Sequence, residues 1–132
     1  MEGFATWDNK TPGISLCMRF GRITIFRTTL AALGYPEYYR FLFNPENRKL
    51  AIQICGMLDD GAYRLPEIKE DETCDIKCKD LVRFVFLTCE WNRNLTYRIP
   101  GKHIPGKRLV DFNLADAIEL NQWRLLEPDD IG

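Results

Sequence analysis

The chain has 132 residues, of which 45% are hydrophobic and 28% charged, and its formal net charge is −1. A chain of this length can bury one core, whereas two independent domains would each be too small. The composition excludes a disordered chain, and no apolar run approaches the roughly 20 residues that a membrane-spanning helix needs.

Charge is unevenly distributed along the chain. Residues 1–55 carry 7 basic and 4 acidic side chains, and residues 76–110 carry 8 and 2. Residues 56–75 carry 2 basic and 7 acidic side chains, and residues 111–132 carry 1 and 6. This pattern has two interpretations: a basic surface that attracts a polyanion, or solvated linkers that collect Asp and Glu.

The first part of the chain predicts strands. Apolar residues alternate with polar ones from Ile14 to Phe20, which indicates a strand that buries both of these residues on one face. The Gly-Arg pair at 21–22 then bends the chain, and residues 23–25 resume the alternation.

A short helix and a hairpin are expected next. Thr28 or Thr29 is a candidate N-cap, and Gly34 is placed to end the helix in a left-handed conformation after two or three turns. The β-rich runs 39–43 and 49–55 are separated by an Asn-Pro turn, which predicts an antiparallel hairpin.

A second unit follows an acidic connector. The connector spans 56–73 and contains a candidate short strand at 62–68. Residues 74–78 alternate as a strand, and an apolar stripe then predicts a helix that begins at Asp80 and extends to Trp91.

The second unit ends like the first one. Residues 95–99 and 107–112 predict another hairpin, joined by a longer loop with two Pro-Gly pairs, and 113–126 has helical spacing. The order strand, short helix, hairpin thus occurs twice. We expect an α+β, mainly β domain in which two pseudo-repeats close one small barrel, with a C-terminal helix or tail.

These expectations divide the single domain, residues 1–132, into four parts. The parts are a first repeat at 13–55, the acidic connector at 56–73, a second repeat at 74–113 and a C-terminal helix or tail at 114–132.

One short motif resembles a known family. Residues 21–25 are Gly-Arg-Ile-Thr-Ile, Leu33-Gly34 closes the short helix, and 41–54 supplies an extended hairpin. This pattern resembles the DNA-binding half of the AbrB-type, swapped-hairpin transcription factors, and the tandem arrangement is similar to that of MraZ. The resemblance implies a swapped-hairpin barrel, duplex DNA as the partner and transcription regulation as the function.

The chain departs from the family pattern on the short helix. Phe26 stands where the family has Pro, Thr29 where it has Leu, and Leu30 where it usually has an Arg that faces DNA. Arg22 is the basic residue retained at a matching position.

Candidate DNA-binding residues come from both repeats, because Arg and Lys supply contacts to phosphates and Arg also reaches base edges. They are Arg19, Arg22 and Arg27 in the first repeat and Lys77, Lys79 and Arg83 in the second.

Catalytic or metal chemistry has little support in the sequence. Cys74 and Cys78 form the closest cysteine pair, but on a strand they lie about 13 Å apart at roughly 3.3 Å per residue, too far to share one ion. The single histidine, His103, lies in a Gly-Pro loop that sequence logic brings to no cysteine. We therefore expect no enzyme, no catalytic residues, no metal and no cofactor.

A protein-binding function stays open beside DNA binding. The near-neutral net charge and Leu30 in place of a basic residue favour a protein-protein interaction module of a phage or mobile element that keeps the barrel without binding DNA. With no leader pattern and five mostly apolar-flanked cysteines, we expect a cytoplasmic protein without membrane contact. A homodimer or higher homo-oligomer, and hairpins that swap within or between chains, also stay open.

Overall fold

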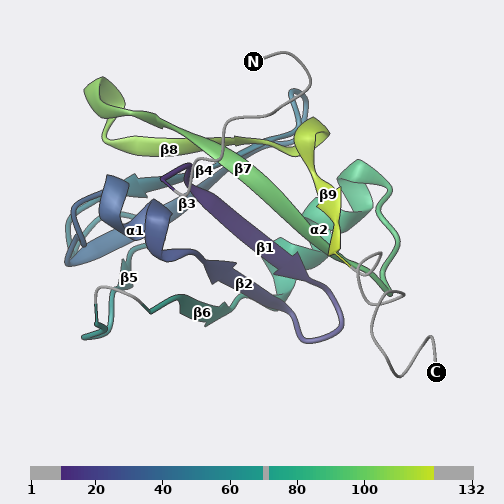
Figure 1. Cartoon of the computed structure of the whole chain (residues 1–132), viewed down its shortest axis with the longest axis horizontal. Helices are drawn as coiled ribbons and strands as arrows, with labels where there is room; N and C mark the ends of the chain where they lie inside the picture. The colour runs from purple at the N-terminus through teal and green to yellow at the C-terminus, as the bar shows by residue number, and fades with distance from the viewer. Residues whose placement is uncertain (1–9, 70–71, 121–132) are drawn as a thin grey trace, which may run out of the picture.

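The computed structural model describes residues 10–69 and 72–120. In this part the protein is mainly β with two α-helices, so the expected α+β, mainly β class is confirmed. The strands form an antiparallel sheet that curls into a half-barrel (Figure 1).

In chain order the elements are β1 (Gly13–Cys17), β2 (Arg22–Ile25), α1 (Arg27–Ala32), β3 (Tyr38–Asn44), β4 (Lys49–Ile54), β5 (Tyr63–Arg64), β6 (Cys74–Lys77), α2 (Lys79–Cys89), β7 (Thr96–Ile104), the 3₁₀ turn η1 (Pro105–Lys107), β8 (Leu109–Asn113), the 3₁₀ turn η2 (Leu114–Asp116) and β9 (Ile118–Glu119).

Strands that are distant in the sequence lie next to each other in the sheet. The order is β5-β3-β4-β8-β7-β1-β2-β6, and β9 also pairs with β7. The hairpin of β3 and β4 and the strand at β6 are where the sequence predicted them, and β5 is a two-residue strand within the predicted 62–68. Alternation identified these strands because one face of each is buried.

The turn between β1 and β2 corrects one prediction. The expected strand to Phe20 ends at Cys17, and residues 18–21 form a turn closed by the Gly21 N–H, which donates to the Met18 carbonyl at 3.1 Å. Gly21 has φ +59°, a conformation that glycine adopts at little cost. Phe20 is therefore 60% exposed instead of buried.

The beginning of α1 corrects another prediction. The helix begins at Arg27 with Phe26 as its N-cap residue and no side-chain cap, so neither threonine is the cap. Thr29 is buried inside the helix, where its hydroxyl accepts the Gly13 N–H and donates to the Gly13 carbonyl, both at 2.8 Å. The end of the helix agrees with the prediction, because Gly34 has φ +72°.

The boundaries of α2 differ slightly from the prediction. The helix begins at Lys79 with Cys78 as the N-cap residue, one residue before Asp80, and it ends at Cys89 because Glu90 turns left-handed at φ +54°. The prediction extended it to Trp91. The start is fixed by tertiary contact, since the Cys78 N–H donates to a backbone carbonyl of the β1–β2 turn.

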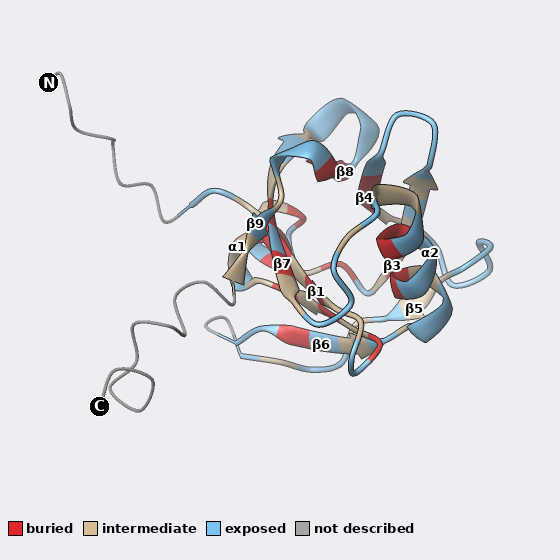
Figure 2. Ribbon diagram, turned by 90° about the vertical axis from the view of Figure 1, so that its right-hand side faces the viewer, coloured by how far each residue is buried: buried red, intermediate tan, exposed pale blue. Residues whose placement is uncertain are grey.

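Helix α2 packs inside the curl of the sheet. Phe84 contacts Phe43 of β3 with ring centroids 5.2 Å apart, and Phe86 contacts Tyr97 of β7 at 5.5 Å. Because β3 and β7 belong to different parts of the sheet, a helix that contacts both must lie on the concave side. Buried side chains of the strands and of α2 form one core cluster (Figure 2), which includes Ile14, Leu16, Ile23, Ile25, Leu50, Ile52, Val82, Val85, Ile99, Val110 and Phe112.

Strand β7 joins the two parts of the sheet. Residues 96–100 pair with β1, and residues 101–104 pair with β8. The sequence prediction placed Pro100 and Gly101 in a long loop, which is wrong: both lie inside β7, and residues 105–107 form the turn of the hairpin. A Pro-Gly pair within a strand lacks one N–H donor and one side chain, and it marks a bend where another element approaches closely.

The segment after β8 corrects the prediction of a helix over 113–126. The Asn113 side chain accepts the Ala115 N–H at 3.1 Å and caps only the short turn η2, in which Leu114 is buried. The chain then pairs with β7 as β9, so Ile118 and Glu119 are extended instead of helical. Residues 121–126 of the expected helix lie outside the described residues.

Gly101→Ala tests the close packing of β7 against β8. A Cβ atom at this position would lie 2.5 Å from Cε1 of Phe112 and 2.7 Å from Cγ1 of Val110, so these two buried side chains would have to shift. We expect the free energy of unfolding to fall by about 1–3 kcal/mol in urea titration, as for overpacked cores. Gly106→Ala is the matched control, because nothing lies within 4 Å of its Cβ position. Equal losses in the two variants would contradict the close approach.

Thr29→Val tests the bridge between α1 and β1. The substitution keeps the side-chain shape and removes the hydroxyl that the buried Gly13 N–H donates to. We expect a loss of about 1–3 kcal/mol in the free energy of unfolding, the cost of an unsatisfied buried donor. Thr29→Ser retains the hydroxyl and should lose less; a larger loss for Ser would indicate that the methyl group, rather than the hydrogen bonds, fixes this position.

Candidate nucleic-acid interface

The β1–β2 turn is held against the beginning of α2. The Cys78 N–H donates to the Gly21 carbonyl at 3.0 Å, directly before the helix. A Cβ atom on Gly21 would lie 3.0 Å from the Cβ of Lys79, so the backbone of the turn and the first residue of the helix are in close contact. This contact brings side chains of the turn and of α2 to one place.

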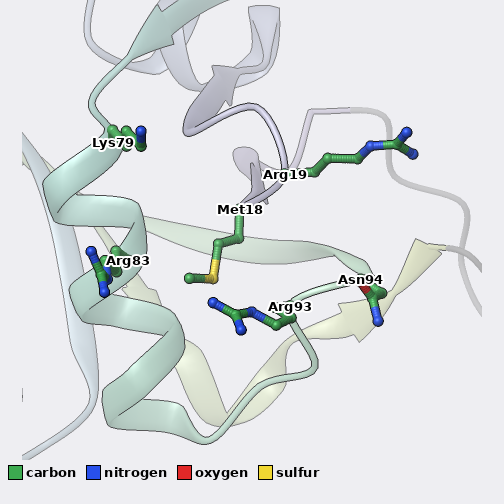
Figure 3. A pocket seen from close by; sticks show the side chains of 6 residues that line it. All are labelled: Met18, Arg19, Lys79, Arg83, Arg93 and Asn94. Carbon is green, nitrogen blue, oxygen red and sulfur yellow. The ribbon is translucent and has the colours of Figure 1, made fainter.

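An open cleft of about 480 Å³ lies at this junction. Its walls come from the β1–β2 turn, from α2 and from the turn between α2 and β7 (Figure 3). We call it the basic cleft, and the residues that line it are Met18, Arg19, Lys79, Arg83, Arg93 and Asn94.

The side chains of the basic cleft differ in direction. The Arg93 guanidinium reaches toward the Met18 sulfur and the side of the cleft where Arg83 lies, whereas Arg19 points away from them into the open (Figure 3). The cleft is therefore a shallow cationic surface with an apolar floor at Met18.

Four positive charges meet here without an ion pair. Among residues 10–69 and 72–120 the one ion pair is Lys49 with Asp111, 3.3 Å apart on β4 and β8, and no carboxylate contacts a cation of the basic cleft. Unpaired cations around a concave surface produce a local positive potential whatever the net charge of the molecule. The cleft is thus suited to a polyanion.

Five of the six residues predicted from the sequence gather around the β1–β2 turn. Arg19, Lys79 and Arg83 line the basic cleft, and Arg22 is the Cα partner of Lys77 across β2 and β6. The Arg22 Nε atom is buried and has no hydrogen-bond partner in the described part of the chain.

Arg27 is the predicted residue that the fold leaves apart. It is exposed at the beginning of α1, beyond the opposite end of β2 from the turn. It lies five positions after Arg22, a span of roughly 16 Å at about 3.3 Å per residue of extended chain.

Sequence reasoning missed Arg93 and Asn94. They lie in the short turn after α2, where the Asn92 side chain accepts the Asn94 N–H at 2.9 Å. A basic residue between two asparagines is a turn signal, but nothing local indicates that this turn returns to the β1–β2 turn. The left-handed Glu90 directs it there.

Cys74 and Cys78, the closest cysteine pair in the sequence, are poorly placed for thiolate chemistry. No three His, Cys, Asp or Glu side chains group as metal ligands in the part of the chain that the structure describes. Burial raises the pKa of the Cys74 and Cys78 thiols. A raised thiol pKa leaves little thiolate at neutral pH.

Neither known proteins nor the helices of this chain indicate a family or a membrane span. No protein-family model, curated protein or solved structure matches the chain. No helix within the described ranges is long and apolar enough to cross a membrane. The likeness to AbrB-type factors therefore rests on the short motif of residues 21–34 and the hairpin of residues 41–54, and the function has to follow from the chemistry of the cleft.

The Cys78 thiol at the start of α2 leads to a pH prediction. Burial raises the pKa of Cys78 to about 11, whereas a thiol in the unfolded chain has a pKa of about 8.5. The unfolded chain thus loses its proton first, so this contribution to the free energy of unfolding is complete below a pH of about 8.5 and decreases as the pH rises toward the folded value. We expect Cys78→Ala to make the decrease shallower in urea titrations over this range.

Part of the slope will remain in that variant, because burial also raises the pKa of Cys74 and Tyr39. An unchanged slope after Cys78→Ala would contradict the burial of this thiol.

Proposed function

We propose that the protein is a non-enzymatic, cytoplasmic, AbrB-like transcriptional regulator that binds duplex DNA, and that the basic cleft holds the phosphate backbone. The observation that carries the proposal is the meeting of four cationic side chains, without an ion pair in the described part of the chain, where the β1–β2 turn contacts α2.

The form of the cleft favours a nucleic-acid backbone over a small molecule. Duplex DNA presents one negative charge about every 1.7 Å along its axis, and proteins that neutralise several phosphates gain affinity by releasing counterions. An open cationic surface accommodates a passing backbone, whereas small ligands are usually enclosed by concave apolar walls. Arg guanidinium groups such as Arg19, which points outward, are also suited to bidentate contact with guanine.

Strand pairing supports two pseudo-repeats. The order strand, strand, helix, strand, strand occurs in residues 13–54 and again in 63–113. Equivalent strands pair with each other, β2 with β6 and β4 with β8. In addition β1 pairs with β7 and β5 with β3, so each unit contributes a strand to the other. This exchange favours a swapped-hairpin-type barrel made of repeats at 13–55 and 74–113, in which β5 of the connector adds a strand to the second repeat.

Burial explains how this chain departs from the AbrB pattern on α1. Leu30, at the position of the family's helix arginine, is 1% exposed and belongs to the core. Thr29 is fully buried and bonds to β1. Helix α1 therefore packs instead of contacting DNA, and in our proposal the equivalent role belongs to Lys79 and Arg83 on α2.

A protein-binding module of a phage or mobile element is the second candidate. Phe84 and Leu87, three residues apart on α2 and hence on one face, are 52% and 65% exposed. Exposed apolar pairs of this kind favour a protein partner or a second copy of the chain. A stoichiometric protein partner in a pull-down, without salt-sensitive nucleic-acid binding, would decide for this function.

The double variant Lys79→Ala/Arg83→Ala tests the DNA-binding proposal. We expect it to weaken binding of a short labelled duplex by roughly tenfold or more and to reduce the slope of log affinity against log salt by about 2, because two phosphate contacts are lost. Fluorescence anisotropy between about 50 and 200 mM salt measures both quantities.

Lys102→Ala/Lys107→Ala is the matched control. It removes the same charge from exposed positions on the β7–β8 hairpin, whose turn lies at the other end of the molecule from the β1–β2 turn (Figure 1). Equal weakening by both double variants, or no binding by the unmodified protein at low salt, would contradict the proposal.

A further inference from the structure

The β1–β2 turn carries an exposed aromatic ring beside the basic cleft. Phe20 is 60% exposed, although rings of this size usually bury most of their surface. The turn projects beyond the strands that it joins (Figure 1). The exposed part of this residue is available to a partner.

Cations flank this ring. The guanidinium carbon of Arg19 lies 5.6 Å from the ring centroid and that of Arg22 lies 5.3 Å from it, both within cation–π range. Arg19 lines the basic cleft, and Arg22 is the Cα partner of Lys77 on β6. Phe20 thus lies between the cleft and a second pair of cations.

The backbone of the turn is fixed before any partner binds. Gly21 donates its N–H to Met18, accepts the Cys78 N–H and lies in close contact with Lys79. A group that is already positioned loses less conformational freedom on binding. The exposure of Phe20 is therefore a property of an ordered turn.

The flanking charges restrict what can cover the ring. An apolar protein surface on Phe20 would also remove Arg19 and Arg22 from water, which is unfavourable unless acceptors replace the water. Duplex DNA supplies both kinds of partner, since every base step has apolar base faces inside and phosphates on its two strands outside.

We propose that Phe20 is a wedge that inserts between neighbouring base pairs of the duplex held by the basic cleft, while Arg19 and Arg22 contact the phosphates beside that step. This inference rests on the proposed DNA binding and specifies a duplex that is kinked on binding. Apolar wedges of this type partly unstack a base step and bend the duplex by about 20–90°.

The energetics predict which duplexes bind best. Opening a base step opposes binding, and the cost is smaller at flexible pyrimidine–purine steps and at mismatches. A wedge therefore makes binding sensitive to a mismatch, whereas phosphate contacts alone are almost indifferent to it. Phe20 should be the side chain responsible for that difference.

The experiment compares the unmodified protein with Phe20→Ala on a matched duplex and on the same duplex with one central mismatch. We expect the unmodified protein to prefer the mismatched duplex by roughly tenfold, the scale of base–aromatic contacts, and Phe20→Ala to bind both equally. Energy transfer between dyes on the two duplex ends, measured at saturating protein, should rise with the unmodified protein and stay flat with Phe20→Ala.

Two further variants serve as controls. Phe20→Leu keeps an apolar wedge and should retain most of the bend, and Leu58→Ala truncates a side chain that is 91% exposed in the connector and should change nothing. Salt-sensitive binding that is the same with and without Phe20 would overturn the wedge and leave DNA binding intact. Preference for a single strand over the mismatched duplex would overturn the wedge in favour of stacking of Phe20 on an unpaired base. Absence of all binding would overturn both the wedge and the proposed DNA binding.

Discussion

The pairing of β7 with both parts of the sheet is the constraint on which the arrangement of the sheet depends. One end of this strand pairs with β1 and β9, and the other end pairs with β8. Gly101 lies so close to Phe112 and Val110 that no side chain fits between them. Because a single strand belongs to both parts of the sheet, it fixes their relative position, and α2 packs against both parts through Phe84 and Phe86.

The basic cleft follows from this curl. Helix α2 is held between β3 and β7 by aromatic contacts, and its first residues then meet the β1–β2 turn, where Cys78 bonds to Gly21. The left-handed Glu90 ends the helix and returns the chain to the same place with Arg93. Three segments that are distant in the sequence therefore supply one group of cations, and no single segment contains the site.

The sequence predicts those elements whose position depends on the local spacing of apolar residues. Alternation with period two identified β2, β6 and the β3–β4 hairpin, because each buries one face. The errors occur where a distant partner decides: Thr29 bonds to Gly13 instead of capping α1, Pro100 and Gly101 continue a strand, and the segment after β8 pairs with β7. For the same reason, the basic residues chosen from the sequence include five that lie around the β1–β2 turn. Arg93 could not be predicted, because its place in the cleft depends on how the chain turns after α2.

The two helices divide structural and charged roles between them. Helix α1 places Thr29 and Leu30 in the interior, and its exposed Arg27 lies away from the β1–β2 turn. Helix α2 buries one face as well, yet it keeps Lys79 and Arg83 exposed beside that turn. The basic cleft is therefore formed by the β1–β2 turn of the first unit and by α2 of the second unit. It exists only while the two units are packed together. Its potential is local, because acidic side chains are concentrated in the connector and beyond β8, and a net charge of −1 is therefore compatible with a site for a polyanion.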